Sequence, residues 1–268
     1  MPTHATAADT PPSDPPGRAA PSVGGLLAAD GWAVLIAAVV TAAIVLGSYG
    51  LARAAGAEPR EAILAALALM TMWVALSSAS LAAEGKTWLS AAIRGAVPAD
   101  TCLLALLILA PLARHPNARA AYLSIGGVFK IYCTLAALAV FSVAAVCLSS
   151  RPTGRRALAL AVSLLLAAAV ASPFWINGLL EAIPYQSGKT VVAWAVHANP
   201  FYSVTGAIVE RVRFFWHEWG MMYGRIGRFA DYPPPPIRWY SSALIYGALA
   251  SIVGLCAIVF RRRPAAAP

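Results

Sequence analysis

The chain has 268 residues, of which 60% are hydrophobic and only 12% are charged, and its formal net charge is +9. So apolar a composition excludes an ordinary soluble domain, and the basic excess is typical of cytoplasmic loops and anionic-lipid contacts rather than of nucleic-acid binding. The four cysteines fall within apolar runs without a Cys-x-x-Cys spacing, so neither a metal knuckle nor a disulfide framework is expected.

The first 31 residues differ from the rest, because they are rich in Pro, Ala, Thr and Asp and poor in large apolar residues. Such a composition cannot bury enough surface to order itself. No basic residues lead directly into a short apolar core, so the segment is not a secretory signal peptide. We therefore expect a disordered cytoplasmic tail at 1–31, a transmembrane domain at 32–263 and a short cytoplasmic tail at 264–268.

Long apolar stretches fill this domain, and the first, from Trp32 to Leu51, contains no charged residue. About 20 such residues cross the hydrocarbon of a bilayer as a helix. The sequence therefore predicts an all-α, polytopic transmembrane helical bundle of about six spans. The third stretch is short for a crossing, so an interfacial helix stays open as an alternative there. The expected spans are Trp32–Arg53, Ala62–Ala83, Ala99–Ala113, Tyr122–Leu148, Ala157–Asn177 and Tyr240–Phe260.

The distribution of Arg between the loops predicts the orientation, because basic residues are enriched in short cytoplasmic loops. The basic clusters at 151–156 and 261–263 both lie inside if 178–239 is extracytoplasmic, and six spans then place both termini in the cytoplasm. Arg114 and Arg119 would fall outside, which opposes this arrangement. If the third stretch did not cross, the two stronger clusters would lie on opposite sides. We therefore expect six crossings of a bacterial-type cytoplasmic (inner) membrane.

The predicted extracytoplasmic segment is not simply polar. Residues 191–209 are apolar but contain His197, Asn199 and Pro200, which is typical of a re-entrant segment that dips into the membrane and returns. Apolar residues then recur at helical spacing, which predicts an amphipathic helix lying at the interface. These residues are Val204, Ile208, Val212, Phe215, Trp219 and Met222.

Motifs for catalysis or cofactor binding are weak. Gly-Lys-Thr occurs at 85–87 and at 188–190, but Ser80 and Ile183 stand where a phosphate loop needs its first glycine. The histidines include no pair three or four residues apart, and the chain has no Gly-x-Ser-x-Gly nucleophile motif. We therefore expect no catalytic, cofactor-binding or metal-binding residues; if ATP drives this protein, a partner hydrolyses it.

A few polar residues near the ends of the predicted spans are candidates for function. Lys130 lies near the start of the fourth span, where a Lys is either functional or extends to the headgroups. Glu181 either lines an outer vestibule or is simply solvated. Glu84 and Lys86 follow the second span and either contact a cytoplasmic partner or cap a helix. The candidate residues of a translocation pathway are Lys130, Glu181 and Asn199.

Several local sequences resemble those of ABC type-2 (ABC-2) permeases, the membrane subunits of ABC exporters. The charged stretch after the family's second span corresponds to 83–88, with one Glu in place of Glu-Arg-Glu. The family's Thr-Leu-rich coupling helix and the Lys after it resemble 101–112 and Lys130, although 101–112 lies in the third expected span. The Ser-rich basic turn at 148–157 and Ala-Asn-Pro-Phe at 198–201 also resemble the family.

The resemblance implies a permease subunit that forms the translocation pathway of an ATP-driven exporter. It implies a separate ABC ATP-binding subunit, a second permease copy or paralogue and membrane lipid as partners, with no nucleic acid. The ATP-binding subunit would press on the segment between the second and third spans. The residues expected to couple to it are Glu84, Lys86, Thr87, Trp88 and Arg94. A non-transporting assembly or anchoring subunit is the alternative reading, and an intramembrane enzyme ranks last.

Overall fold

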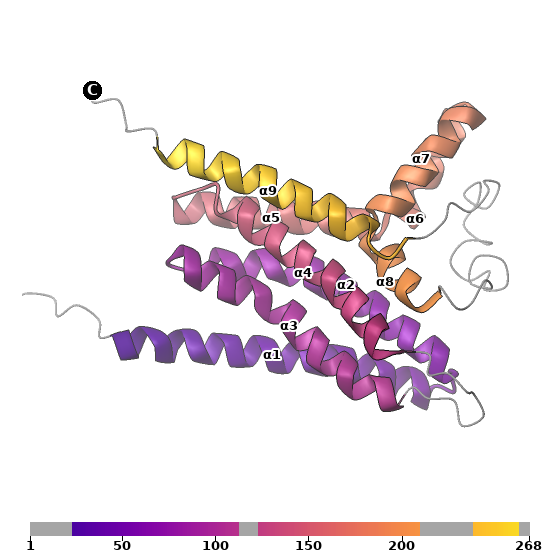
Figure 1. The fold of residues 1–268 in the computed structure, drawn as a ribbon, viewed down its shortest axis with the longest axis horizontal. Helices are drawn as coiled ribbons and strands as arrows, with labels where there is room; N and C mark the ends of the chain where they lie inside the picture. Colours follow the sequence, from indigo (N-terminus) through magenta and orange to yellow (C-terminus); the bar gives the residue numbers. More distant parts are fainter. Residues whose placement is uncertain (1–22, 113–122, 210–237, 263–268) are drawn as a thin grey trace, which may run out of the picture.

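A computed structural model of the chain describes residues 23–112, 123–209 and 238–262, and the regular structure within these ranges is α-helical (Figure 1). The helices are α1 (Val23–Ala54), α2 (Pro59–Ala83), α3 (Trp88–Leu112), α4 (Ile125–Val146), α5 (Pro152–Val170), α6 (Ser172–Ala182), α7 (Tyr185–Ala198), α8 (Pro200–Val209) and α9 (Ser241–Arg262).

Six of these helices, α1 to α5 and α9, are long and apolar enough to cross a membrane. They run side by side in alternating directions, so the α2–α3 and α4–α5 turns lie at one end with the start of α1 and the end of α9 (Figure 1). We call this the basic end, because Lys86, Arg151, Arg155 and Arg156 belong to it. The opposite end, which holds the α1–α2 turn and α6 to α8, is the α8 end. The predicted all-α, six-span bundle is confirmed.

The third span is longer than the sequence predicts, because α3 begins at Trp88 and not at Ala99. The Thr87 hydroxyl accepts a hydrogen bond of 3.1 Å from the Ser90 amide, which satisfies one donor at the start of the helix. Because α3 packs against α1, α2 and α4, the interfacial-helix alternative is wrong. Residues 101–112, which resemble a coupling helix, lie inside this span and not in a turn at the end of the bundle.

Other boundaries differ for local reasons. Helix α1 begins at Val23, so residues 23–31 are helical. The remaining predicted tails, 1–22 and 264–268, lie outside the described residues. Helix α5 ends at Val170 although the predicted span continues to residue 177, because Pro173 lies in the first turn of a new helix.

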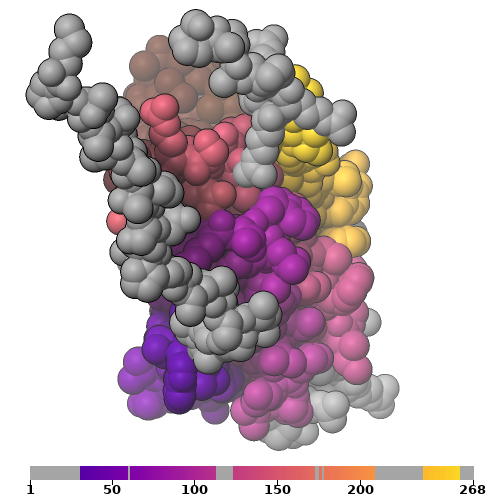
Figure 2. All heavy atoms as spheres, turned by 90° about the vertical axis from the view of Figure 1, so that its left-hand side faces the viewer, coloured from indigo at the N-terminus to yellow at the C-terminus, as the bar shows by residue number. Residues whose placement is uncertain are grey.

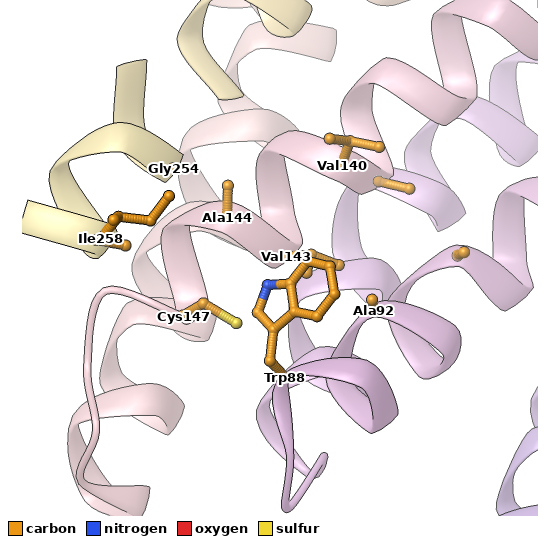
Figure 3. A pocket seen from close by; sticks show the side chains of 11 residues that line it. Trp88, Ala92, Val140, Val143, Ala144, Cys147, Gly254 and Ile258 are labelled. Carbon is orange, nitrogen blue, oxygen red and sulfur yellow. The ribbon is translucent and has the colours of Figure 1, made fainter. Parts of the chain in front are cut away.

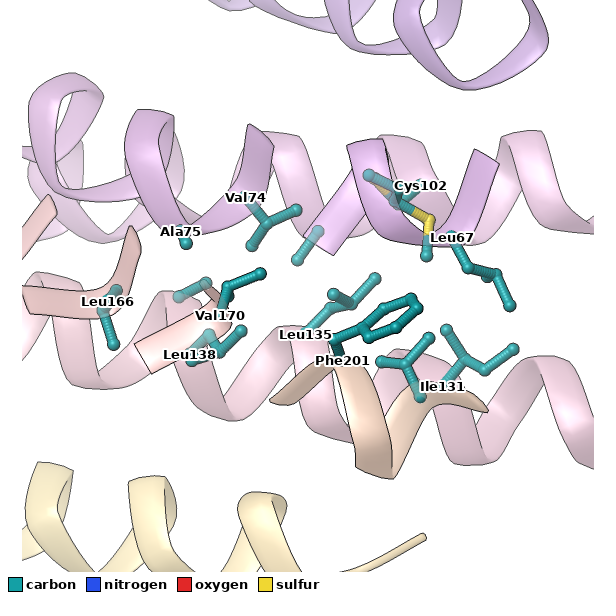
Figure 4. Close-up of a cluster of buried hydrophobic side chains, with 14 of the residues drawn as sticks. Leu67, Val74, Ala75, Cys102, Ile131, Leu135, Leu138, Leu166, Val170 and Phe201 are labelled. Carbon is teal, nitrogen blue, oxygen red and sulfur yellow. The ribbon is translucent and has the colours of Figure 1, made fainter. Parts of the chain in front are cut away.

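The core lies where α2, α3, α4, α5 and α8 meet. Figure 4 shows side chains of α2, such as Leu67 and Val74, facing those of α4, with Phe201 of α8 inserted between the two helices. Helices in lipid associate through close packing, because surrounding acyl chains are as apolar as the core. One close approach lies at Gly95, where an added Cβ would be 2.5 Å from Val143 Cγ2 and 3.2 Å from Ala82 Cβ. Gly95 therefore lets α2, α3 and α4 come together near the basic end.

Three short helices, α6 to α8, cover the α8 end, with breaks that include Pro184 and Pro200. Helix α7 projects from the bundle, whereas α8 packs against α2, α4, α5 and α9 (Figure 1). Val204 and Ile208 are buried in the core, so this part of the predicted amphipathic helix packs its apolar side against the bundle. The rest of that predicted helix, beyond residue 209, lies outside the described residues.

Candidate functional site

The α2–α3 turn is tied to the start of α5 at the basic end. Arg155 donates a hydrogen bond of 2.6 Å from Nη1 to the Gly85 carbonyl oxygen and one of 3.1 Å from Nε to the Ser149 carbonyl oxygen. Arg156 Nη2 lies 3.5 Å from Glu84 Oε1. In Figure 2, which views this end, the magenta residues around the α2–α3 turn lie between indigo α1 and salmon α5. The two turns therefore form one connected surface.

Glycines make this junction compact. A Cβ on Gly85 would overlap the backbone of Ala91 in α3, so the turn can fold back on α3 only without a side chain there. A Cβ on Gly154 would overlap the Ser149 side chain, which closes the α4–α5 turn. The α2–α3 turn therefore needs glycine for close approach to the Ala91 backbone and not for an unusual backbone angle.

The structure brings most of the predicted coupling residues together. Glu84, Lys86, Thr87 and Trp88 follow one another through the α2–α3 turn into the first turn of α3, and their side chains are exposed. Arg94 is partly buried further along α3, about 9 Å from Trp88 at the rise of an α-helix, so it does not belong to the same exposed surface.

An apolar groove of about 580 Å³ opens between α3, α4 and α9 beside this turn. Figure 3 shows the Trp88 indole standing against Val143 and Cys147 of α4, with Gly254 and Ile258 of α9 on the opposite wall. Trp88 therefore belongs both to the exposed turn and to the wall of a groove between membrane helices.

Asn199, one of the predicted pathway residues, lies inside the packing at the α8 end and is 1% exposed. Its Nδ2 donates to the Val170 carbonyl oxygen and to Ser172 Oγ, each over 3.1 Å. Its Oδ1 accepts from the Phe201 amide over 2.9 Å. One side chain thereby satisfies backbone groups at the α5–α6 break and at the α7–α8 break, which indicates a structural role.

Side chains from α9 secure the same junction. Ser242 Oγ lies 2.9 Å from the His197 carbonyl oxygen and 3.0 Å from the Asn199 carbonyl oxygen, and it can donate its proton to either. Tyr246 donates over 3.0 Å to the Ala198 carbonyl oxygen. His197 and Ala198 belong to the last turn of α7, where carbonyl groups run out of partners within the helix, so these side chains of α9 cap α7.

The other two pathway candidates lie elsewhere. Lys130 Nζ stands 5.3 Å from the centre of the Trp239 ring, a cation–π arrangement that links α4 to the segment before α9. Glu181 is exposed on α6. Of the three predicted pathway residues, Asn199 is buried at a helix junction, Lys130 makes a cation–π contact and Glu181 is exposed at the surface. They do not form one cluster.

Sequence reasoning missed several residues that hold these sites together. Arg155 was counted only for its charge, and its contact joins positions 70 residues apart. Ser172, Ser242 and Tyr246 gave no signal, because serine and tyrosine within apolar runs are common and their partners are remote in sequence.

No group of three or more His, Cys, Asp or Glu side chains that could hold a metal ion occurs in the described parts of the chain. Comparison of the chain with protein-family models, with curated proteins and with solved structures found no match.

Proposed function

We propose that the chain is the membrane-spanning permease subunit of an ATP-driven ABC exporter, coupled to a separate ATP-binding subunit. The observation that supports this most is the α2–α3 turn, which exposes Lys86 and Trp88, is tied to α5 by Arg155 and borders the groove between α3 and α9. A partner that pushes on this turn would act on several membrane helices at once.

In this proposal the ATP-binding subunit docks on the basic end. Its closure displaces the α2–α3 turn, and Arg155 and Arg156 carry the displacement to α5 while Trp88 carries it to the walls of the groove. The partner must bind the two arrangements of the turn with different affinities, because otherwise it shifts no equilibrium. ATP hydrolysis takes place in the partner, and a second permease copy or paralogue completes the translocation pathway.

The proposed orientation follows from charge. Lys86, Arg151, Arg155 and Arg156 lie at one end of the bundle, and short loops rich in Lys and Arg stay in the cytoplasm. The basic end would therefore face the cytoplasm of a bacterial-type inner membrane, with both termini on that side. The α8 end would face outward.

The first test is purification from the native membrane in mild detergent, followed by mass spectrometry of the proteins that copurify. We expect a stoichiometric ATPase with a complete phosphate loop. A photocrosslinking amino acid at Lys86 should then react with this ATPase, whereas the same amino acid at Glu181, exposed on α6 at the α8 end, should not.

Copurification of other membrane subunits without an ATPase would contradict the permease proposal and favour a non-transporting assembly or anchoring subunit. Crosslinking to the ATPase from position 181 but not from position 86 would support an ATPase partner, but it would contradict the proposal that this partner docks on the basic end.

A further inference from the structure

A second cleft, of about 660 Å³, lies at the α8 end between α7, the start of α9 and the segment that leads into α9. The helices that form its two walls are joined by the hydrogen bonds that Ser242 and Tyr246 of α9 make to the last carbonyl groups of α7. The two walls are therefore held at a set distance and belong to one connected unit of the fold.

The polar side of this cleft is cationic. Lys189 of α7 and Arg238 before α9 both line it, His197 lies on the α7 wall, and none of the described residues lining it is acidic. Arg238 Nη1 donates over 3.1 Å to the Tyr240 hydroxyl, and the Arg238 carbonyl oxygen accepts from Ser241 Oγ over 2.8 Å. A guanidinium held in this way uses one of its donors and presents a planar fork that matches a phosphate.

The other side of the cleft is apolar and faces outward. Trp194 of α7 is 66% exposed and Leu244 of α9 is 64% exposed, and both line the cleft. Trp and Tyr are typical of the headgroup level of a bilayer, where one side of a residue meets acyl chains and the other meets water. Two cations from different elements thus stand next to a surface suited to an acyl chain.

We propose that this cleft binds the phosphate of an anionic amphiphile, with Lys189 and Arg238 pairing with the phosphate and the apolar tail lying along Trp194 and Leu244. The membrane itself supplies such a molecule as an anionic phospholipid. A soluble phosphate ester has the same phosphate head but no acyl chain. This binding does not depend on an ATP-binding subunit, because every residue involved belongs to this chain.

The test uses the purified full-length chain in detergent and compares phosphatidylglycerol with phosphatidylcholine by native mass spectrometry. We expect phosphatidylglycerol to bind at least about tenfold more tightly, a difference of about 1.4 kcal/mol. Both lipids carry the phosphate, but the choline of phosphatidylcholine brings a positive charge next to Lys189 and Arg238 and offsets their attraction for it. The double variant Lys189→Gln, Arg238→Gln should lose this preference. The control Arg53→Gln, Arg151→Gln removes the same charge from exposed positions elsewhere and should keep it.

Phosphatidylglycerol with brominated acyl chains gives a second readout, because bromine quenches nearby indoles. Part of the tryptophan fluorescence should be quenched, and Trp194→Phe should remove that part. Glycerol phosphate is added as a competitor: displacement of the lipid would identify the phosphate head as sufficient for binding, and no displacement would identify the intact lipid as the ligand. Equal binding of the two lipids, or equal losses in the double variant and its control, would overturn the proposal.

Discussion

Arg155 of α5 donates a hydrogen bond of 2.6 Å from Nη1 to the carbonyl oxygen of Gly85, 70 positions earlier in the chain. Its Nε donates at the same time to the Ser149 carbonyl oxygen over 3.1 Å. One guanidinium therefore joins the α2–α3 turn to the α4–α5 turn, and its planar fork is the feature that Lys cannot reproduce.

Replacing Arg155→Gln should loosen this junction. We expect a loss of about 1–3 kcal/mol in the free energy of unfolding, because hydrogen bonds to a charged group are lost at a partly buried position. Hydrogen–deuterium exchange of residues 84–88 should rise in the same variant.

The neighbouring variant Arg156→Gln is the matched control. Its contact with Glu84 is 3.5 Å long and joins side chains that are 72% and 54% exposed, so its loss should cost under about 1 kcal/mol. Equal exchange at 84–88 in both variants would show that Arg155 does not hold the turn.

Gly85→Ala should disrupt the same turn through sterics alone. The added methyl group would overlap the Ala91 backbone, which cannot move as a side chain can, so we expect a loss of about 1–3 kcal/mol and a lower Tm. Gly50→Ala is the control, because no atom lies within 4 Å of the added carbon and alanine favours a helix. A Tm for Gly85→Ala at or above that of Gly50→Ala would contradict the close approach at Gly85.

The bundle could be predicted because hydropathy alone decides which segments enter lipid. The start of α3 could not, because Arg94 interrupts the apolar run, whereas a single Arg is tolerated when its long side chain extends toward a helix end. The run at 101–112 resembles a coupling helix in composition, but it lies within α3, in agreement with the third span that hydropathy predicts.

The candidate sites were predictable only in part. Glu84 to Trp88 are contiguous, so the sequence places them on one turn. Asn199 was singled out for its polarity in an apolar segment, but its structural role depends on Val170 and Ser172, which no local pattern connects to it. Residue types near a helix break indicate that polar groups are needed, not which groups they satisfy.

Asn199→Ala tests whether this residue belongs to a pathway or to the packing. The substitution leaves the Phe201 amide and the Val170 carbonyl oxygen without their side-chain partner in a buried site, so we expect a loss of about 2–4 kcal/mol in unfolding free energy. Ser80→Ala, at an exposed position, should change it by less than about 0.5 kcal/mol. An unchanged Tm for Asn199→Ala would contradict a structural role for Asn199 and would favour its place in a translocation pathway.

Trp88→Ala tests whether the groove between α3 and α9 senses the α2–α3 turn. The side chain is 60% exposed, so its removal should lower the unfolding free energy by less than about 2 kcal/mol, yet it takes away the wall that faces Val143 and Cys147. If the turn couples an ATP-binding subunit to the membrane helices, the ATPase activity of the copurified complex should change severalfold in Trp88→Ala. Leu89→Ala is the control, because Leu89 is 61% exposed on the same helical turn and does not line the groove. Equal ATPase activities in the two variants would show that Trp88 transmits nothing from the turn, and the connection through Arg155 to α5 would then carry the coupling alone.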